Sequence, residues 1–344
     1  MVQRALYALL ALGPLVVLLD HATDAGDLTL FPLAAVALVP LAWLIGEATE
    51  QAARYTGAGV GGFLNASFGN APELIIALVA VSDGLTDVVR ASLTGSVVGN
   101  LLLVLGFVLL VARPGPIDRT SAFVSLATVL FAVVLLLIAS IPGFHGDPDR
   151  DSLAVVSLPI AIVLLAVRIV VNRRSLRRQR SMAPAEMPAD GWSLRLALVV
   201  LAAATVSTAF VTETLVGSLE AFAREVHLSE FFVAIVIVAI VGNITEHGSA
   251  VLLAARGRLR LATEIGLASA SQVAGFLIPA VVILSWAIDP LALSMRPVEL
   301  ASMGGAALLV AFALFPPRTS RAAGGLLLAA YAALVVAFYF VGDR

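Results

Sequence analysis

The amino-acid sequence predicts an all-α polytopic membrane protein of about 11 transmembrane helices, one leading helix followed by two inverted five-helix repeats. Composition is the first observation, because 60% of the 344 residues are hydrophobic, 13% are charged and the mean hydropathy is +1.02. No class of soluble globular protein has this composition. The second observation is a series of apolar runs close to the roughly 20 residues that cross a bilayer. The third is a Gly-Asn-x-x-Glu motif that occurs twice.

The expected spans follow one another through short connections that carry Gly, Pro or Asp. They cover residues 4–20, 28–51, 61–82, 91–111, 119–140, 151–171, 193–218, 229–253, 265–286, 297–315 and 322–341. Only the connection between the spans 151–171 and 193–218 is long. It contains Pro184 and Pro188 and shows no periodic pattern of hydrophobic residues. We therefore expect a leading helix at 1–27, a first repeat at 28–172, a basic cytoplasmic linker at 173–192 and a second repeat at 193–344.

The placement of arginines predicts the orientation, because cytoplasmic loops carry an excess of positive charge. If the N-terminus is cytoplasmic, most arginines fall on the inner side, including the run that opens the linker at 173–180. The C-terminus then lies outside. This run most simply fixes the topology, and binding of anionic lipid is the alternative. We expect a multi-pass protein of a bacterial inner or plasma membrane.

The two copies of the motif predict the geometry of the repeat. They lie at 69–73 and 242–246, on the third and eighth expected spans, 173 positions apart. Equivalent helices are five spans apart, which is an odd number, so the two copies run in opposite directions through the membrane. Inverted repeats are common in secondary transporters, which bind their substrate near the bilayer midplane.

Glu73 and Glu246 are the strongest candidates for functional residues. A carboxylate in a hydrocarbon setting costs several kcal/mol unless it is paired or hydrated, so it is a functional candidate by default. A single buried glutamate can also be a structural group bonded to a neighbour. Two glutamates at equivalent places of a duplicated chain favour function, and we expect both to serve one ion site.

Asn70 and Asn243 lie three residues before the glutamates, so each amide shares a helix face with its carboxylate. Two carboxylates, two amide oxygens and freed backbone carbonyls form an all-oxygen shell that suits a hard cation, above all calcium. Because the chain has no cysteine and four histidines, a soft-metal site is not expected. No cofactor is expected, since calcium would be the transported substrate.

The glycines and the proline of the motif are expected to open the backbone. Gly69 and Gly242 permit sharp backbone turns, although such residues also serve ordinary close packing of membrane helices. Pro72 lacks an N–H and strains a helix, which can free the carbonyl of Phe68.

Other polar residues of the spans have two interpretations each. Ser96, Asn100, Ser269 and Gln272 support the site or simply bond helices to one another. His247 is a hydrogen-bonding partner, a proton relay or a metal ligand. Four acidic residues near expected helix ends form a solvated rim or a vestibule that attracts cations, namely Glu47, Glu50, Glu213 and Glu230.

At these residues the chain resembles the calcium/proton exchanger (CAX) family of the cation/calcium exchanger superfamily. The resemblance rests on Gly-Glu-Ala-Thr-Glu at 46–50, Leu-Asn-Ala-Ser-Phe-Gly-Asn-Ala-Pro-Glu-Leu-Ile-Ile-Ala at 64–77 and Val-Gly-Asn-Ile-Thr-Glu-His at 241–247. It covers nearly the whole chain. Two departures are the Ile-Thr pair at 244–245, where relatives often have Ala-Ala, and a basic linker where relatives are often acidic. Regulation by calcium through the linker is therefore not carried over.

The resemblance implies that Glu73 and Glu246 bind the cation and exchange it for protons, with Asn70 and Asn243 as further ligands. It also implies that three more polar residues line the site, namely Ser96, Ser269 and Gln272. The expected activity is secondary active exchange of Ca2+ for H+ by alternating access at a two-glutamate site. The expected partners are these two ions and the lipid bilayer, and the net charge of −2 is too small to indicate a nucleic acid. The oligomeric state stays open.

Two other functions were weighed. A sodium- or potassium-coupled calcium exchanger usually carries extra hydroxyls beside the acidic residue, and Ala71 and Pro72 supply none. An intramembrane enzyme would need a nucleophile with its base or a zinc motif such as His-Glu-x-x-His, and the sequence has no convincing example.

Overall fold

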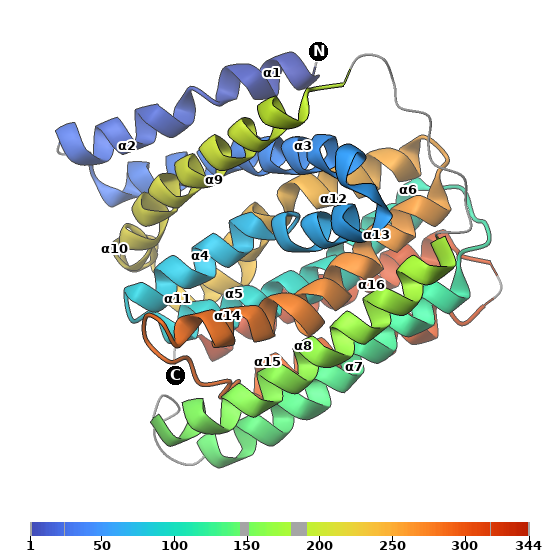
Figure 1. Ribbon diagram of the computed structural model, residues 1–344. Helices are drawn as coiled ribbons and strands as arrows, with labels where there is room; N and C mark the ends of the chain where they lie inside the picture. Colours follow the sequence, from blue (N-terminus) through green and yellow to red (C-terminus); the bar gives the residue numbers. More distant parts are fainter. Residues whose placement is uncertain (1, 24, 145–150, 180–190, 317, 343–344) are drawn as a thin grey trace. The chain divides into compact units, whose positions relative to one another are not determined.

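The computed structural model describes residues 2–23, 25–144, 151–179, 191–316 and 318–342, and all the regular elements among them are helical (Figure 1). The elements of the first half are α1 (Val2–Leu9), α2 (Leu12–Ala22), α3 (Asp27–Phe68), α4 (Ala71–Ser82), α5 (Thr86–Val98), η1 (Gly99–Val104), α6 (Leu105–Val111), α7 (Arg119–Ser140), η2 (Ile141–Gly143) and α8 (Asp151–Gln179). Those of the second half are α9 (Leu194–Gly217), α10 (Leu219–Glu225), α11 (Glu230–Phe232), η3 (Val233–Val238), α12 (Ala239–Ala255), α13 (Leu259–Gln272), η4 (Val273–Leu277), α14 (Ile278–Ser285), α15 (Pro297–Ala313) and α16 (Arg321–Val341).

The helices confirm the predicted fold class of a polytopic membrane protein. Within the described residues, nine helical segments are long and apolar enough to cross a membrane, and α4 and α15 are two shorter apolar helices. Together they correspond one to one to the eleven expected spans. Residues 173–179, expected in the linker, continue α8, and 180–190 lie outside the described part of the chain.

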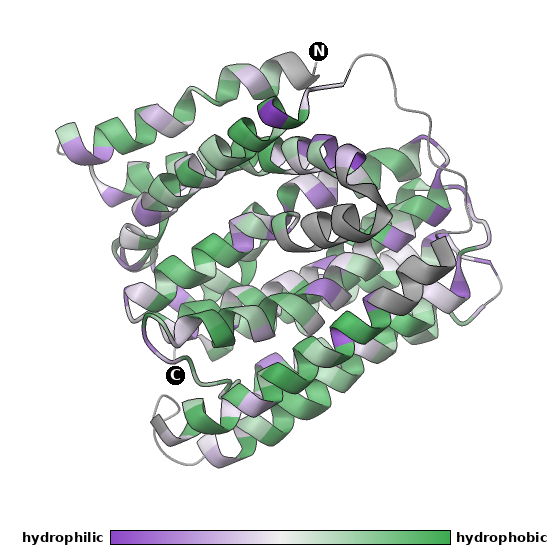
Figure 2. Cartoon of the chain, in the orientation of Figure 1, coloured by the Kyte–Doolittle hydropathy of each residue, from purple (hydrophilic) through white to green (hydrophobic). Residues whose placement is uncertain are grey.

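Large apolar side chains on the outside of the helices explain the hydropathy of the sequence. Phe123, Phe312 and Phe315 are each more than 70% exposed. Figure 2 shows that hydrophobic residues dominate the helices along most of their lengths. Such surfaces are stable against lipid tails, because each helix satisfies its own backbone hydrogen bonds.

The largest difference from the expected span boundaries lies at the end of the second span. The second expected span ends at 51, whereas α3 continues without a break to Phe68. Glu47 and Glu50, expected near a helix end, therefore lie inside a long helix. Gly57 and Gly59 follow in the sequence, but a glycine costs a helix only about 1 kcal/mol and does not force it to end. The third expected span is consequently divided between the end of α3 and α4.

The chain forms two compact units, and each unit takes segments from both halves of the sequence. The first comprises Met1–Val79 and Ala166–Val226, and the second Ala80–Leu165 and His227–Arg344. In the first unit α2, α3 and α9 pack together, so that a Cβ on Gly13 would lie 3.7 Å from both Leu41 and Val211. The expected division into repeats along the sequence stays a prediction.

Small residues allow helices of the second unit to approach closely. Gly106 on α6 and Gly324 on α16 face each other, and a Cβ on Gly324 would lie 2.7 Å from the Gly106 carbonyl oxygen. An extended segment at 291–295 is also buried here, and side chains satisfy its backbone: Ser157 Oγ accepts from Leu293 N at 2.7 Å. Backbone groups away from water need such partners.

Three long helices of the second unit contain a π-helical turn. They are α5–η1–α6, α11–η3–α12 and α13–η4–α14. The turns η1 and η4 lie at almost equivalent positions of the two sequence halves, since Gly99 corresponds to Gln272 at the motif's offset of 173 positions. π-Helical turns are rare and occur frequently at functional sites.

Candidate functional site

The first copy of the motif forms a helix break. Gly69 and Asn70 separate α3 from α4, which begins at Ala71, so Pro72 occupies the first turn, where its missing N–H costs no helix bond. The Asn70 carbonyl accepts the first α4 bond from Leu74 N at 3.0 Å. Asn70 is fully buried and Glu73 is 7% exposed, in the first unit.

The second copy has the same residue types but a different backbone. Gly242, Asn243 and Glu246 all lie inside α12, which is unbroken, and the departure from regular α-helix occurs upstream in η3. Gly242 therefore does not open the helix. The second copy has no proline, since Ile244 and Thr245 stand where the first copy has Ala71 and Pro72, and this explains the difference.

Asn243 is the centre of a buried hydrogen-bond network. Its Nδ2 donates to Ser96 Oγ and to the Ala239 carbonyl, both at 2.9 Å. Its Oδ1 accepts from Asn100 Nδ2 at 3.0 Å, and Asn100 Nδ2 also donates to the Ser96 carbonyl at 2.9 Å. All these residues belong to the second unit, where Ser96 and Asn100 contact the motif, an arrangement that fits both of their expected roles.

Four buried polar atoms beside this network have no hydrogen-bond partner among the described residues: Asn100 Oδ1, Glu246 Oε2, His247 Nε2 and Ser269 Oγ. Ser269 interacts with the Glu246 carboxylate, although its Oγ makes no hydrogen bond of standard geometry. His247 lies next to Gly99, because its Cε1 atom is 4.0 Å from the position that a Cβ on Gly99 would occupy.

An unsatisfied buried polar group costs free energy, so several of them together indicate a place for a ligand. Three of the four atoms are oxygens of a carboxylate, an amide and a hydroxyl, which are the ligand types of hard cations such as calcium. Gln272 ends α13 directly before η4 and is half-buried. The second unit thus holds Glu246 with most of its expected supporting residues.

The acidic residues of the expected vestibule belong to both units, Glu47, Glu50 and Glu213 to the first and Glu230 to the second. Glu47 accepts from Gln51 Nε2 at 2.7 Å, and Glu50 from Arg54 at 3.2 Å. Glu213 is exposed on α9, and Glu230 opens α11. Within the described part of the chain, no three His, Cys, Asp or Glu side chains gather as a metal site. The vestibule stays a prediction.

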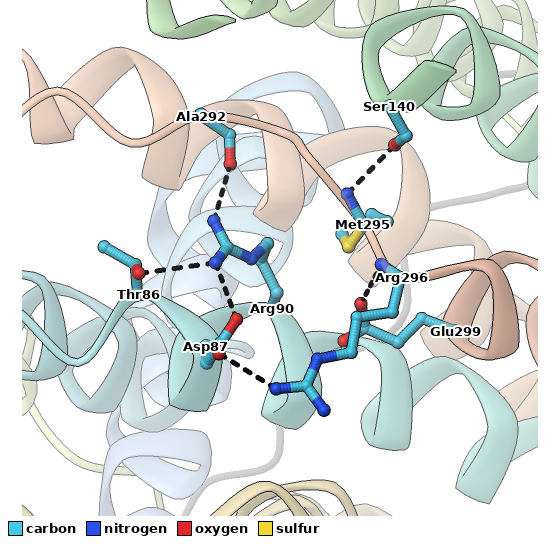
Figure 3. A network of polar contacts seen from close by, with 8 residues as sticks. All are labelled: Thr86, Asp87, Arg90, Ser140, Ala292, Met295, Arg296 and Glu299. Carbon is cyan, nitrogen blue, oxygen red and sulfur yellow. Dashed lines mark hydrogen bonds and ion pairs between the residues drawn. The ribbon is translucent and has the colours of Figure 1, made fainter. Parts of the chain in front are cut away.

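Sequence reasoning missed a charged cluster that joins α5 to the segment before α15 (Figure 3). Asp87 Oδ1 accepts from Arg90 at 2.7 Å, and Asp87 Oδ2 accepts from Arg296 at 2.9 Å. Arg90 also reaches the Ala292 carbonyl at 3.3 Å, and Glu299 Oε2 accepts from Arg296 N at 2.6 Å. Arg90 and Glu299 are only 1% exposed. The available signal was Glu299, a charged residue inside the expected apolar span 297–315.

Comparison with known proteins finds one family model that matches most of the chain. The model describes the sodium/calcium exchanger protein family and matches residues 27–172 and 196–340. It matches twice, once in each half of the sequence, as expected for a duplicated chain.

Curated relatives resemble the chain over nearly its whole length. A Ca(2+)/H(+) antiporter of Synechocystis sp. is 34% identical, over 92% of this chain and 92% of the relative. The Ca(2+)/H(+) antiporter ChaA of Bacillus subtilis is 33% identical, over 98% of this chain and all of the relative. The solved structure of native YfkE is 33% identical and superposes with a TM-score of 0.81, over 97% of this chain and 99% of that chain.

Proposed function

Because the chain belongs to the sodium/calcium exchanger protein family, in its calcium/proton exchanger branch, we propose that it is a secondary active antiporter that exchanges Ca2+ for H+. The chain is a multi-pass membrane transporter and not an enzyme. We place it in a bacterial inner or plasma membrane, with a cytoplasmic N-terminus, where the inward proton gradient would drive calcium out. The arginine distribution supports this orientation.

One observation carries the proposal: a carboxylate stands at the same place of a duplicated motif in each half, among apolar helices. We assign Glu73 and Glu246 to bind the cation and, alternately, protons. Both carboxylates with one Ca2+ are neutral, and so are both carboxyls when protonated. The empty site carries two negative charges, which are costly to move through a low-dielectric barrier. Only the loaded states therefore change the side of access.

The amides have separate roles in this proposal. Asn70 is assigned as a ligand of the cation, on the helix break before Glu73. Asn100 contributes its buried Oδ1, which has no partner among the described residues. Asn243 keeps one lone pair on Oδ1 for the cation, while its hydrogen bonds hold Asn100 and Ser96 in place. Ser269 and Gln272 line the site on α13.

A sodium-coupled calcium exchanger is the second candidate, and Thr245 is the observation that favours it. This threonine places one hydroxyl beside Glu246, whereas the first copy of the motif has none between Asn70 and Glu73. Since the first copy has no such hydroxyl and the curated relatives at 33–34% identity are Ca(2+)/H(+) antiporters, the proton-coupled function is supported better.

Proteoliposomes containing the purified protein test the function directly. An imposed pH gradient should drive calcium movement, and sodium or potassium gradients of the same size should not. Glu73→Gln and Glu246→Gln should each abolish exchange, because glutamine keeps the shape but neither balances calcium nor carries a proton. Glu220→Gln is the matched control, since Glu220 is exposed and pairs with Arg224 at 3.0 Å. Calcium flux driven by sodium alone would overturn the proposal in favour of the second candidate.

A further inference from the structure

Two long helices of the second unit contact each other along one line of residues. The first is 86–111, which carries Ser96 and Asn100, and the second is 230–255, which carries Asn243 and Glu246. On the second helix the contact line recurs every four residues, at Phe231, Ile235, Ala239 and Asn243. These residues come from α11, η3 and α12, and all three elements contact α5.

The middle of the line is a contact of backbones. A Cβ on Gly95 would overlap the Ile235 carbonyl oxygen and lie 2.7 Å from Ala239 Cβ. Only glycine allows helices this close. Because no flexible side chain separates the two helices here, a shift of one is passed directly to the other.

The beginning of the line is held by Arg296. Its guanidinium binds Asp87 Oδ2 at 2.9 Å and lies over the Phe231 ring, 4.5 Å from the centroid. A guanidinium within about 6 Å of a ring centroid is attracted by the ring quadrupole, more strongly when both are desolvated. Phe231 is 3% exposed and also meets Phe338 edge-on. One arginine therefore joins the first turns of both helices.

Arg296 is itself fixed by the charged cluster of Figure 3. Its backbone N–H donates to the buried Glu299 carboxylate, and Arg90 ties the same Asp87 to the Ala292 carbonyl. Asp87 is thus shared by two guanidinium groups, Arg90 and Arg296. Buried charges persist when each is paired and hydrogen-bonded, and removal of one partner leaves the other uncompensated.

We propose that Arg296 is a positioning residue for the second copy of the motif, acting through Phe231 and Asp87. It sets how α12 lies against α5 and thereby where Asn243 meets Ser96 and Asn100. The effect of this role on calcium transport rests on the proposed function. The contacts that carry it lie wholly within the second unit.

Two variants test this role. Arg296→Gln removes the guanidinium and Phe231→Leu removes the ring, so each breaks the same contact from one side. Leucine keeps an apolar side chain beside Phe338 and touches no charge, so it remains informative if the arginine variant fails to fold. The control is Arg224→Gln, because Arg224 is 70% exposed and its ion pair joins it to Glu220 within α10.

The transport measurement separates positioning from general damage. We expect both variants to raise the half-saturating calcium concentration about tenfold while the maximal rate changes less than twofold. The double variant should be no worse than the worse single one, because both remove the same contact. Additive effects, or an unchanged half-saturating concentration in both single variants, would overturn the proposal.

Hydrogen exchange supplies a readout that does not need transport. Backbone amides between Phe231 and Asn243 should exchange faster in Arg296→Gln and Phe231→Leu than in the wild type, and the control should match the wild type. Unchanged exchange in this stretch would refute the positioning role. If the wild-type protein moved no calcium against protons, the proposed function would fail, and the exchange comparison would still decide the role of Arg296.

Discussion

Asn100 donates a side-chain N–H to Asn243 Oδ1 at 3.0 Å, so the two amides form a pair across two helices. Each amide has one oxygen and two N–H groups. Asn243 uses its oxygen and its NH2 group on protein partners, whereas Asn100 Oδ1 is buried without one among the described residues. The pair therefore offers a cation both lone pairs of Asn100 Oδ1, but only the second lone pair of Asn243 Oδ1.

We expect Asn100→Ala and Asn243→Ala each to weaken calcium binding about tenfold, the size of one lost hydrogen bond or ligand of roughly 1.4 kcal/mol. The number of protons exchanged per calcium should not change, because an amide does not titrate. The double variant should bind about as well as the worse single one, since the residues act as a unit. Calorimetric calcium binding and proton counting in vesicles measure this. A changed proton count in either variant would contradict the assignment.

Gly95→Ala should destabilise the second unit. A methyl group at this position overlaps the Ile235 carbonyl oxygen, so the helices must separate. Overpacking of this kind costs about 1–3 kcal/mol. Thermal unfolding in detergent measures the loss.

The matched control for this prediction is Gly305→Ala on α15. A Cβ there meets nothing within 4 Å, and alanine favours a helix over glycine by about 1 kcal/mol. Equal stability changes in the two variants would show that the close approach at Gly95 does not hold the helices together.

Asp118 should make stability depend on pH. Its carboxylate accepts from Ser121 N at 3.1 Å and Thr120 N at 3.0 Å, and it binds Arg260 at 2.8 Å. The Ser121 backbone bond and then the Arg260 bond hold the pKa of Asp118 below its usual value of 3.8. A depressed carboxyl pKa gives stability that is fully present above the unfolded-state value and is lost as pH falls through the folded-state value.

We therefore expect the wild type to lose stability below about pH 4, and Asp118→Asn to lose less of it there. At neutral pH the variant should be less stable by at most about 1 kcal/mol, because asparagine keeps the N-cap acceptor and loses only the charge that pairs with exposed Arg260. Melting temperatures between pH 3 and 7 test both statements. Asp289→Asn, at an exposed position, should follow the wild-type curve. Parallel curves for wild type and Asp118→Asn would reject the role of this cap.

Much of this fold could be predicted from the sequence, because hydrophobic length alone marks each span. The duplicated motif likewise marked Glu73 and Glu246 without any structure. The continuity of α3 could not be predicted, since two glycines weaken a helix without ending it. The π-helical turn η3 upstream of the second motif copy also escaped prediction, because no residue pattern along the sequence marks such a turn.

Contacts between residues far apart in the sequence could not be predicted either. Asp87, Arg90 and Arg296 read as ordinary charges near helix ends until the fold joined them through one carboxylate. Asn100 was expected as a supporting residue. Only the direction of its hydrogen bond to Asn243 shows that the Asn243 oxygen accepts a bond while the Asn100 oxygen accepts none among the described residues. No pattern along the sequence encodes such a direction.

The shared-site mechanism makes its strongest prediction about pH. If calcium and protons compete for Glu73 and Glu246, calcium binding must weaken as pH falls, because carboxylates bind the metal only when they are deprotonated. The two groups should titrate as one coupled unit, in two steps that belong to the pair. Below both steps the affinity should fall by up to about a hundredfold per pH unit, and between them by about tenfold.

Calorimetric calcium binding to the purified protein across a pH series measures these slopes. Glu73→Gln and Glu246→Gln should each flatten the dependence toward tenfold or less, besides weakening the binding, because one exchangeable proton is lost. Glu220→Gln should keep the full wild-type slope. An affinity that is constant from about pH 5 to 8 would mean that protons use a separate path, with His247 as the nearest titratable side chain in sequence, and the shared-site mechanism would have to be abandoned.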